Sequence, residues 1–184
     1  LVGCGLGVCD DTLKIVFSLI ENSTTTLVLD ADALNCVAKQ PEILLKKKAP
    51  IIITPHPGEM SRLTGLATPL VNAERERVAL DFAQKYGVVT VLKGAGTVIA
   101  SPNGKVLVNP TGNSGMATGG SGDVLAGMTA SILAQGASAF SSAAAAVYLH
   151  GLAGDIAAEK YGKISMLPTD LINCIPLAYK RCGF

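Results

Sequence analysis

Short apolar runs alternate along the chain with longer stretches in which apolar residues recur every three or four positions. The runs cover residues 26–30, 50–54 and 88–92, and each leads into polar or glycine-rich sequence. Apolar runs of this length without alternation are typical of parallel strands that are covered on both faces. Apolar positions at helical spacing in residues 10–21 and 72–86 predict amphipathic helices between these strands. The pattern therefore predicts an α/β fold with a mostly parallel central sheet flanked by helices.

The second half of the chain has a different pattern. Two apolar segments within residues 97–109 flank an Asn-Gly dipeptide, which is a strong signal for a hairpin turn. Three helices are expected after the hairpin, and the second of them, over residues 138–160, is rich in alanine. Gly151 and Gly154 in that helix lead us to expect close packing against the helix before it. The sequence contains no repeat, linker or domain boundary, so residues 1–184 are expected to form one domain.

Composition narrows the class of protein. Hydrophobic residues make up 49% of the chain and charged residues 16%, with a net charge of +1. So small a net charge gives no electrostatic basis for binding nucleic acid or an anionic membrane, and no apolar run reaches membrane-spanning length. The five cysteines include no C-x-x-C pair, which favours reduced cysteines in a cytoplasmic protein over disulfides or a zinc site.

The start of the chain is unusual for an α/β protein. The first residue is Leu1, and a glycine loop at Gly3–Gly7 follows almost at once. Such loops normally follow a strand. We therefore expect the chain to be the C-terminal portion of a longer protein, with the N-terminal part of the fold missing.

The most distinctive stretch is Asn113–Gly127, N-S-G-M-A-T-G-G-S-G-D-V-L-A-G, in which glycines and hydroxyl residues precede one aspartate and an apolar helix. Backbone N–H groups in such a loop can close around an anion, and the helix dipole adds positive potential there. Asp123 is expected in the first helical turn, beside the anion, where it is a candidate general base. The alternative is that Asp123 is only a helix N-cap or a first-turn aspartate after a flexible loop.

Polar residues recur where the predicted strands end, and the carboxyl ends of parallel strands meet at one edge of a sheet. These polar residues predict a single site at that edge, although each of them could instead stabilise a turn or cap a helix. Lys93 can reach a phosphate as a point charge. His56, held between two prolines, is placed to meet a ligand, but a structural role fits it equally well. The residues concerned are Asp30, Asp32, Asn35, His56, Glu59, Lys93 and Thr97.

Four segments together closely resemble the ADP-dependent NAD(P)H-hydrate dehydratases of the ribokinase-like superfamily. They are V-L-D-A-D-A-L-N (28–35), I-T-P-H-P-G-E-M (53–60), V-L-K-G-A-G-T (91–97) and the glycine-rich stretch 113–127. The resemblance extends from the opening glycine loop through L-H-G-L-A-G-D (149–155) to the last helix. Two positions depart from it: Cys4 stands where the family usually has proline, and Ser121 where threonine is commoner.

This resemblance implies a ribokinase-like fold and a reaction. The family repairs hydrated NADH and NADPH (NADHX and NADPHX) by removing water from the damaged nicotinamide ring. ADP would be the co-substrate, with Mg²⁺, and AMP and phosphate would be released. The resemblance also implies a homo-oligomer and no metal ion bound directly by side chains.

Residue roles follow from the same resemblance. Asp123 would take the proton from the ring hydroxyl as that hydroxyl attacks the β-phosphate, and with Gly5 and His56 it would contact the hydrated dinucleotide. Asp32, Asn35 and Glu59 would act indirectly, through water or Mg²⁺-bound water. The residues expected to bind the nucleotide are Lys93, Gly94, Ala95, Gly96, Thr97, Asn113, Ser114, Gly115, Met116, Ala117, Thr118, Gly119, Gly120, Ser121 and Gly122.

Two other functions are compatible with these residues. A ribokinase-like kinase that phosphorylates a hydroxymethylpyrimidine, a thiazole or a sugar would use the same base and anion site, but would release a stable phosphorylated product. A nucleotide-binding chain without activity would keep the glycine-rich loop and perform no chemistry.

Overall fold

The computed structural model describes residues 1–183 and contains a five-stranded sheet in the order β1-β2-β3-β4-β5. The strands are β1 (Leu27–Leu29), β2 (Ile51–Ile53), β3 (Val89–Leu92), β4 (Val98–Ala100) and β5 (Val106–Val108). The first three are parallel, and β4 and β5 continue the sheet as an antiparallel hairpin. Val2 adds a parallel bridge to Leu29 beyond β1. The predicted strands, the hairpin and the mostly parallel sheet are confirmed.

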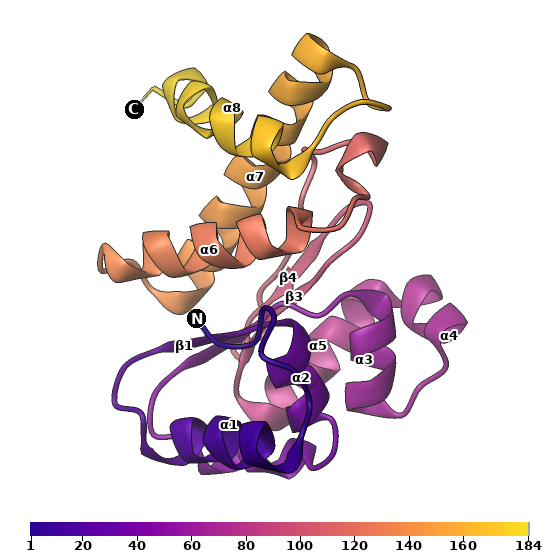
Figure 1. The fold of residues 1–184 in the computed structure, drawn as a ribbon. Helices are drawn as coiled ribbons and strands as arrows, with labels where there is room; N and C mark the ends of the chain where they lie inside the picture. The colour runs from indigo at the N-terminus through magenta and orange to yellow at the C-terminus, as the bar shows by residue number, and fades with distance from the viewer. Residues whose placement is uncertain (184) are drawn as a thin grey trace.

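Helices cover both faces of this sheet, as Figure 1 shows. One face carries α1 (Asp10–Asn22), α2 (Ala31–Val37), the 3₁₀ helix η1 (Pro41–Lys46), α3 (Pro57–Thr64), α4 (Thr68–Ala73) and α5 (Arg75–Tyr86). The other carries α6 (Ser121–Ala134), α7 (Ala139–Tyr161) and α8 (Pro168–Arg181), with the short 3₁₀ helix η2 (Ser114–Met116) before them.

Two apolar cores result, one on each face, because consecutive strand residues point to opposite sides of a sheet. In β1, Leu27 and Leu29 belong to the core under α1–α5, whereas Val28 belongs to the core under α6–α8. Ile51 and Ile53 of β2 divide from Ile52 in the same way. This is why β1, β2 and β3 are unbroken apolar runs: both faces of these three strands are buried.

Two details differ from the sequence-based expectation. The helix expected over residues 72–86 is interrupted at Glu74, whose backbone is not helical (φ −125°, ψ 42°), so α4 and α5 are separate. Gly151 and Gly154 do not serve contact with α6. A Cβ atom on Gly151 would collide with Thr111, and one on Gly154 with Met116, so these glycines let the loop before α6 pack against α7.

The topology brings the strand ends of the first half and the start of α6 to one edge of the sheet. Within residues 1–183, no helix is both long enough and apolar enough to cross a membrane. All five cysteines are free thiols.

Candidate active site

The N-terminus of α6 opens the site. Gly120 is the N-cap and adopts a left-handed backbone conformation (φ 97°) that favours glycine, so the loop turns sharply into the helix. Asp123 lies in the first turn, and its side chain is exposed. Gly120, not Asp123, is the N-cap residue, and Asp123 is a first-turn aspartate of this helix. The first-turn N–H groups and the helix dipole at this end favour a bound anion, although the N–H of Ser121 already donates to the carbonyl of Thr118 (3.3 Å).

The loop before α6 is anchored to α7 by Asn113. The amide of Asn113 donates to the carbonyl of Gly154 (3.0 Å) and to Asp155 Oδ1 (2.9 Å). Its Oδ1 accepts a hydrogen bond from the backbone N–H of Gly115 (3.0 Å), and Asp155 Oδ2 accepts one from Gly112 N–H (2.8 Å). Asn113 and Asp155 therefore fix the backbone of the loop, and Asp155 is a residue that sequence reasoning did not single out.

Lys93, at the end of β3, lies beneath this loop and is not a free charge. Its Nζ donates to Asp30 Oδ1 at 2.7 Å, and Glu59 Oε2 lies 3.9 Å away. Asp30 is 1% exposed. A Cβ atom added to Gly122 would lie 3.3 Å from Nζ, which places the ammonium against the first turn of α6. Lys93 thus links the ends of β1 and β3 to the anion loop.

The rest of the segment 93–97 forms a tight turn between β3 and β4. Thr97 closes the turn, since its hydroxyl donates to the carbonyl of Gly94 (3.0 Å). Gly94 packs against the guanidinium of Arg75, which donates to the carbonyl of Leu92 (2.8 Å). Ala95 and Gly96 line a hollow of about 490 Å³ next to the start of α5.

The opening glycine loop lies over the end of β1. Asp32 Oδ2 accepts a hydrogen bond from the backbone N–H of Gly7 (2.8 Å), so Asp32 holds the loop that contains Gly5. Gly3 approaches the carbonyl of Asp30 too closely for any side chain to fit there. Gly5 itself adopts a left-handed conformation (φ 67°), and a side chain added to it would meet no atom within 4 Å.

Cys4 lies between the carboxylates of Asp30 and Asp123. The thiol donates to Asp30 Oδ2 at 3.9 Å, and the ligand atoms of the three residues all lie within 4.8 Å of one another. Burial, a hydrogen bond to Asp123 and the charges of Asp30 and Asp123 raise the pKa of the Cys4 thiol to about 11, against a smaller opposing effect of Lys93. Sequence reasoning noted Cys4 only as a departure from the family.

His56 and Glu59 form a reciprocal cap at the start of α3. Nδ1 of His56 accepts hydrogen bonds from the N–H groups of Gly58 (3.0 Å) and Glu59 (3.3 Å), and Glu59 Oε2 accepts one from His56 N–H (2.7 Å). Because Nδ1 is an acceptor, Nε2 carries the proton and lies 3.5 Å from Glu59 Oε1. The His56 side chain is still half exposed, so the structural role leaves part of the ring open to a ligand.

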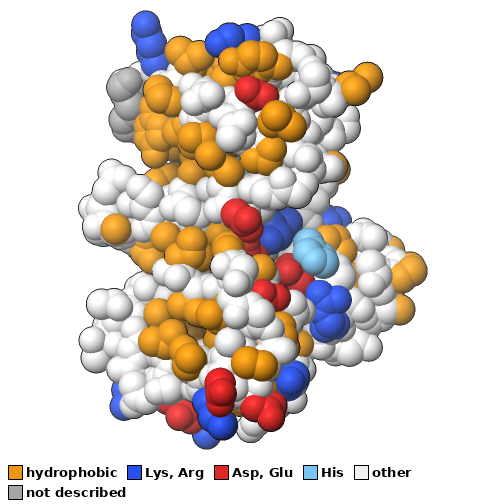
Figure 2. Space-filling model, in the orientation of Figure 1, with side chains coloured by type: hydrophobic (Ala, Val, Ile, Leu, Met, Phe, Trp, Pro, Cys, Tyr) orange, Lys and Arg blue, Asp and Glu red, His pale blue; other side chains and the backbone are white. Residues whose placement is uncertain are grey.

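Asn35 is the predicted site residue with the least direct connection to this cluster. Its Oδ1 accepts a hydrogen bond from Nε of Arg62 (2.9 Å), which ties α2 to α3. Asp32, Lys93, Glu59 and Asp123, by contrast, are connected through the glycine loop, Asp30 and Cys4. Figure 2 shows acidic, basic and histidine side chains gathered at the waist of the molecule.

His150, on α7, supports the anion loop from below and was not predicted. It is 8% exposed, and Nε2 donates to the carbonyl of Ser121 (2.9 Å). Burial lowers its pKa to about 4, opposed in part by the hydrogen bond to Ser121 and assisted by the charge of Lys93. The neutral ring therefore fixes the first residue of α6. The segment L-H-G-L-A-G-D was the available signal for both His150 and Asp155.

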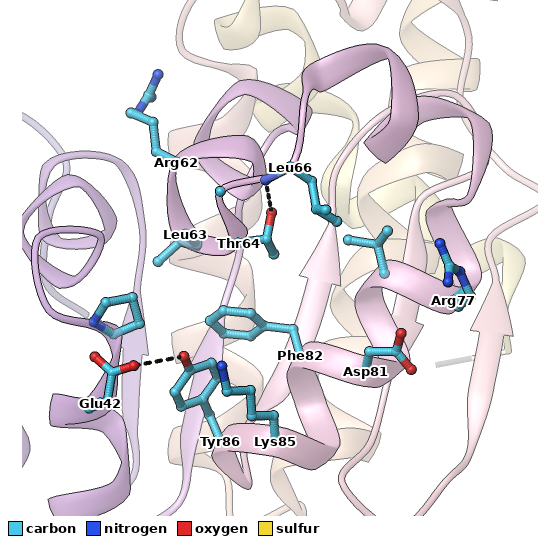
Figure 3. Close-up of a pocket in the computed structure, with 13 residues that line it drawn as sticks. Glu42, Arg62, Leu63, Thr64, Leu66, Arg77, Asp81, Phe82, Lys85 and Tyr86 are labelled. Atoms are coloured by element: carbon cyan, nitrogen blue, oxygen red, sulfur yellow. Dashed lines mark hydrogen bonds between the residues drawn. The ribbon is translucent and has the colours of Figure 1, made fainter.

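A separate cavity lies on the α3–α5 side of the molecule. It has a volume of about 550 Å³ and is lined by residues of η1, α3 and α5. Figure 3 shows the rings of Phe82 and Tyr86 at its floor, with Tyr86 hydrogen-bonded to Glu42. None of the predicted site residues lines this cavity.

Comparison with known proteins identifies the family. Residues 1–177 match the family model described as NAD(P)H-hydrate dehydratase. This chain belongs to the NAD(P)H-hydrate dehydratase family. A bifunctional NAD(P)H-hydrate repair enzyme Nnr from Thermofilum pendens is 44% identical over 179 residues, which are 97% of this chain and 34% of the relative.

Solved structures agree with this family and with the ribokinase-like fold. The ADP/ATP-dependent NAD(P)H-hydrate dehydratase from Bacillus subtilis, co-crystallised with ATP/Mg²⁺, has a TM-score of 0.77 and 37% identity, over 85% of this chain and 55% of its own. A ribokinase-like superfamily protein from Enterococcus faecalis has a TM-score of 0.83 and 31% identity, and the match covers 98% of this chain and 62% of that protein. The chain thus spans about a third of the bifunctional relative and less than two thirds of these two structures.

Proposed function

We propose that the site dehydrates hydrated NADH or NADPH at the expense of ADP, giving NAD(P)H, AMP and phosphate. One observation carries the proposal: the exposed carboxylate of Asp123 lies in the first turn of a helix whose N-terminus is built to bind an anion, next to Lys93. A base beside a phosphate site is what transfer of a phosphoryl group to a substrate hydroxyl requires. Membership of the dehydratase family supplies the substrate class.

The chemistry of dehydration explains why a phosphate is needed. Hydroxide is a poor leaving group and phosphate is a good one. Asp123 takes the proton from the ring hydroxyl while the hydroxyl oxygen attacks the β-phosphorus of ADP, and the bond to AMP breaks. The ring then expels phosphate, and loss of a proton from the neighbouring ring carbon to solvent restores the double bond. The overall balance is hydrated NAD(P)H plus ADP to NAD(P)H, AMP, phosphate and a proton.

The backbone around Gly119–Gly122 is proposed to stabilise the negative charge on the transferred phosphoryl group. Its N–H groups are at the positive end of α6, and His150 and Asn113 hold the surrounding loop in place. A preorganised set of donors costs no reorganisation during the reaction. Lys93 adds positive charge under Gly122, although most of its own charge is balanced by Asp30.

The segments Lys93–Thr97 and Asn113–Gly122 are proposed to hold the nucleotide, and Gly5 and His56 to contact the hydrated dinucleotide. The left-handed Gly5, with open space where a side chain would be, lets the substrate approach the backbone closely. The His56 side chain is half exposed and can therefore contact the substrate. Asp32 and Glu59 act indirectly. Asp32 holds the opening loop by its hydrogen bond to Gly7, and Glu59 positions His56 and Lys93.

Mg²⁺ would enter with the nucleotide, bound to its phosphate oxygens. The site fits an ion held in this way, because the phosphates supply the hard oxygen atoms that Mg²⁺ prefers, and Asp32 and Glu59 can act on it through bound water. The ion would supply charge neutralisation at the phosphates. Asp123 keeps its role as the proton acceptor.

The test supplies hydrated NADH, ADP and Mg²⁺ to the 184-residue chain and follows recovery of NADH absorbance, with release of AMP and phosphate measured in parallel. We expect all three products in equal amounts. Stable phosphorylation of a small alcohol without recovery of NADH would instead establish the kinase alternative. Nucleotide binding with neither reaction would leave only a nucleotide-binding function.

A further inference from the structure

A cluster of three potential metal ligands is formed by Cys4, Asp30 and Asp123. The proposed phosphoryl transfer gives a role to Asp123 but none to the cluster as a whole. One sulfur and two carboxylate oxygens, from the opening loop, the end of β1 and the first turn of α6, lie within 4.8 Å of one another. Around a tetrahedral zinc ion, with Zn–S about 2.3 Å and Zn–O about 2.0–2.2 Å, such atoms would lie about 3.5 Å apart, so a shift of up to about 1 Å by each side chain would close the set on one ion. Three protein donors and an open fourth position form an accessible tetrahedral site.

The buried member of this set lacks a strong partner. Asp30 is 1% exposed, and its two oxygens have different environments. Oδ1 is paired with Lys93 at 2.7 Å, whereas in residues 1–183 the only hydrogen-bond donor to Oδ2 is the Cys4 thiol at 3.9 Å. A thiol is a weak donor, and buried carboxylate oxygens are normally well satisfied. Oδ2 therefore points toward Cys4 with unused capacity to bind.

The local charge also favours a cation. Asp30, Glu59 and Asp123 carry three formal negative charges, and within residues 1–183 Lys93 is the one lysine or arginine paired with them, while His56 lies beside Glu59. The cluster with a protonated thiol therefore has a formal charge of −2, and a divalent ion that displaces the thiol proton would reduce it to −1. Because Lys93 pairs with Oδ1, it leaves the Oδ2 side of Asp30 free for the ion.

We propose that Cys4, Asp30 and Asp123 bind a thiophilic divalent cation of the Zn²⁺ class, and that the bound ion blocks Asp123. Binding replaces the thiol proton by the metal, so that R–SH and M²⁺ give R–S–M⁺ and H⁺, and the proton leaves to solvent. No oxidation or reduction is involved. The blocking of catalysis rests on the proposed role of Asp123 as base, whereas the metal site itself does not.

The direct test uses Cd²⁺, because a Cd²⁺–thiolate bond gives an ultraviolet charge-transfer band. The exposed Cys9 and Cys182 are first replaced in a Cys9→Ser/Cys182→Ser protein, which leaves Cys4 as the one exposed thiol. We expect one equivalent of Cd²⁺ to produce the band, and Zn²⁺ to compete for it. Adding Cys4→Ser should abolish the band and lower Zn²⁺ affinity at least about tenfold.

A second variant separates the ligands from the fold. Asp123→Asn, at an exposed position, should also weaken Zn²⁺ binding at least about tenfold while thermal unfolding stays the same. An absent band, or a band that survives Cys4→Ser, would overturn the metal site. If the Cys4-dependent band forms but the metal-loaded protein still repairs hydrated NADH, the inhibition is overturned. If the band forms and metal-free protein shows no repair, the proposed function fails while the site stands.

Discussion

The Lys93 ammonium and the buried Asp30 carboxylate lie 2.7 Å apart under the first turn of α6. This pair joins the ends of β3 and β1, so the cation that was expected to reach for a phosphate is already held by the protein. Its position is fixed before any nucleotide arrives, which suits electrostatic preorganisation. The position of Lys93 in the site therefore depends on the buried negative charge of Asp30 at the edge of the sheet.

Asp123→Asn should lower turnover by about 10²–10⁴-fold, the usual contribution of a general base, because the amide cannot accept the proton. AMP affinity should stay within about twofold, since the anion is held by backbone groups. Turnover is measured by NADH recovery and affinity by calorimetry. A variant that keeps the wild-type rate would show that Asp123 is not the base.

Lys93→Met should destabilise the fold by about 3 kcal/mol, because it leaves the Asp30 carboxylate buried without its ion-pair partner. Urea unfolding measures the loss. The matched control is Lys93→Met/Asp30→Asn, which removes the unpaired charge and should recover most of the stability. Equal stability of the single variant and the wild type would mean that the pair contributes little.

Acid should weaken the fold through His150. Its pKa is lowered to about 4 by burial, whereas an unfolded histidine titrates near 6.5, so the unfolded chain binds more protons between these values. Stability contributed by the neutral ring is therefore present above pH 6.5 and is lost as pH falls to about 4, by on the order of 3 kcal/mol.

The control for this acid dependence is His150→Gln, which retains a donor toward the Ser121 carbonyl but does not titrate. The free energy of unfolding, measured from pH 7 to pH 4, should fall less steeply in this variant than in the wild type. Identical slopes in the two proteins would exclude His150 as the source.

Gly151→Ala should destabilise the protein by about 1–3 kcal/mol, because the new methyl group would collide with the hydroxyl of Thr111 and, slightly farther away, with its backbone carbonyl. Gly127→Ala, in α6, is the matched control, since a Cβ atom there meets nothing within 4 Å. It should be neutral or stabilising by up to about 1 kcal/mol. Thermal unfolding of both variants measures the contrast, and equal effects would refute the loop contact.

Cys9 should react with iodoacetamide faster than Cys4 at pH 8. The pKa of Cys4 is raised to about 11, which leaves about one thiolate in a thousand, whereas hydrogen bonds from Thr12 lower the pKa of Cys9. Mass spectrometry of the labelled peptides gives both rates. Faster labelling of Cys4 would contradict the proposed environment between Asp30 and Asp123.

The order of strands and helices was readable from the chain because its patterns are local. Apolar runs at β1, β2 and β3, the Asn-Gly turn and the helical periodicities each depend on neighbouring residues alone. The break at Glu74 was missed because the apolar spacing continues across it. The positions of Gly151 and Gly154 were noticed, but their partner was wrong, since spacing in one helix does not say what packs against it.

The sequence by itself determined the α/β class, the motifs typical of the family, the anion loop and Asp123 as a candidate base. Only the tertiary structure decided the contacts: Lys93 with Asp30, His150 beneath Ser121, Asn113 with Asp155, and Cys4 between two carboxylates. The physical reason is distance along the chain. Cys4 is 26 residues from Asp30 along the chain, and Lys93 is 63 residues from it. No local sequence pattern indicates which of these distant groups the folded sheet brings together.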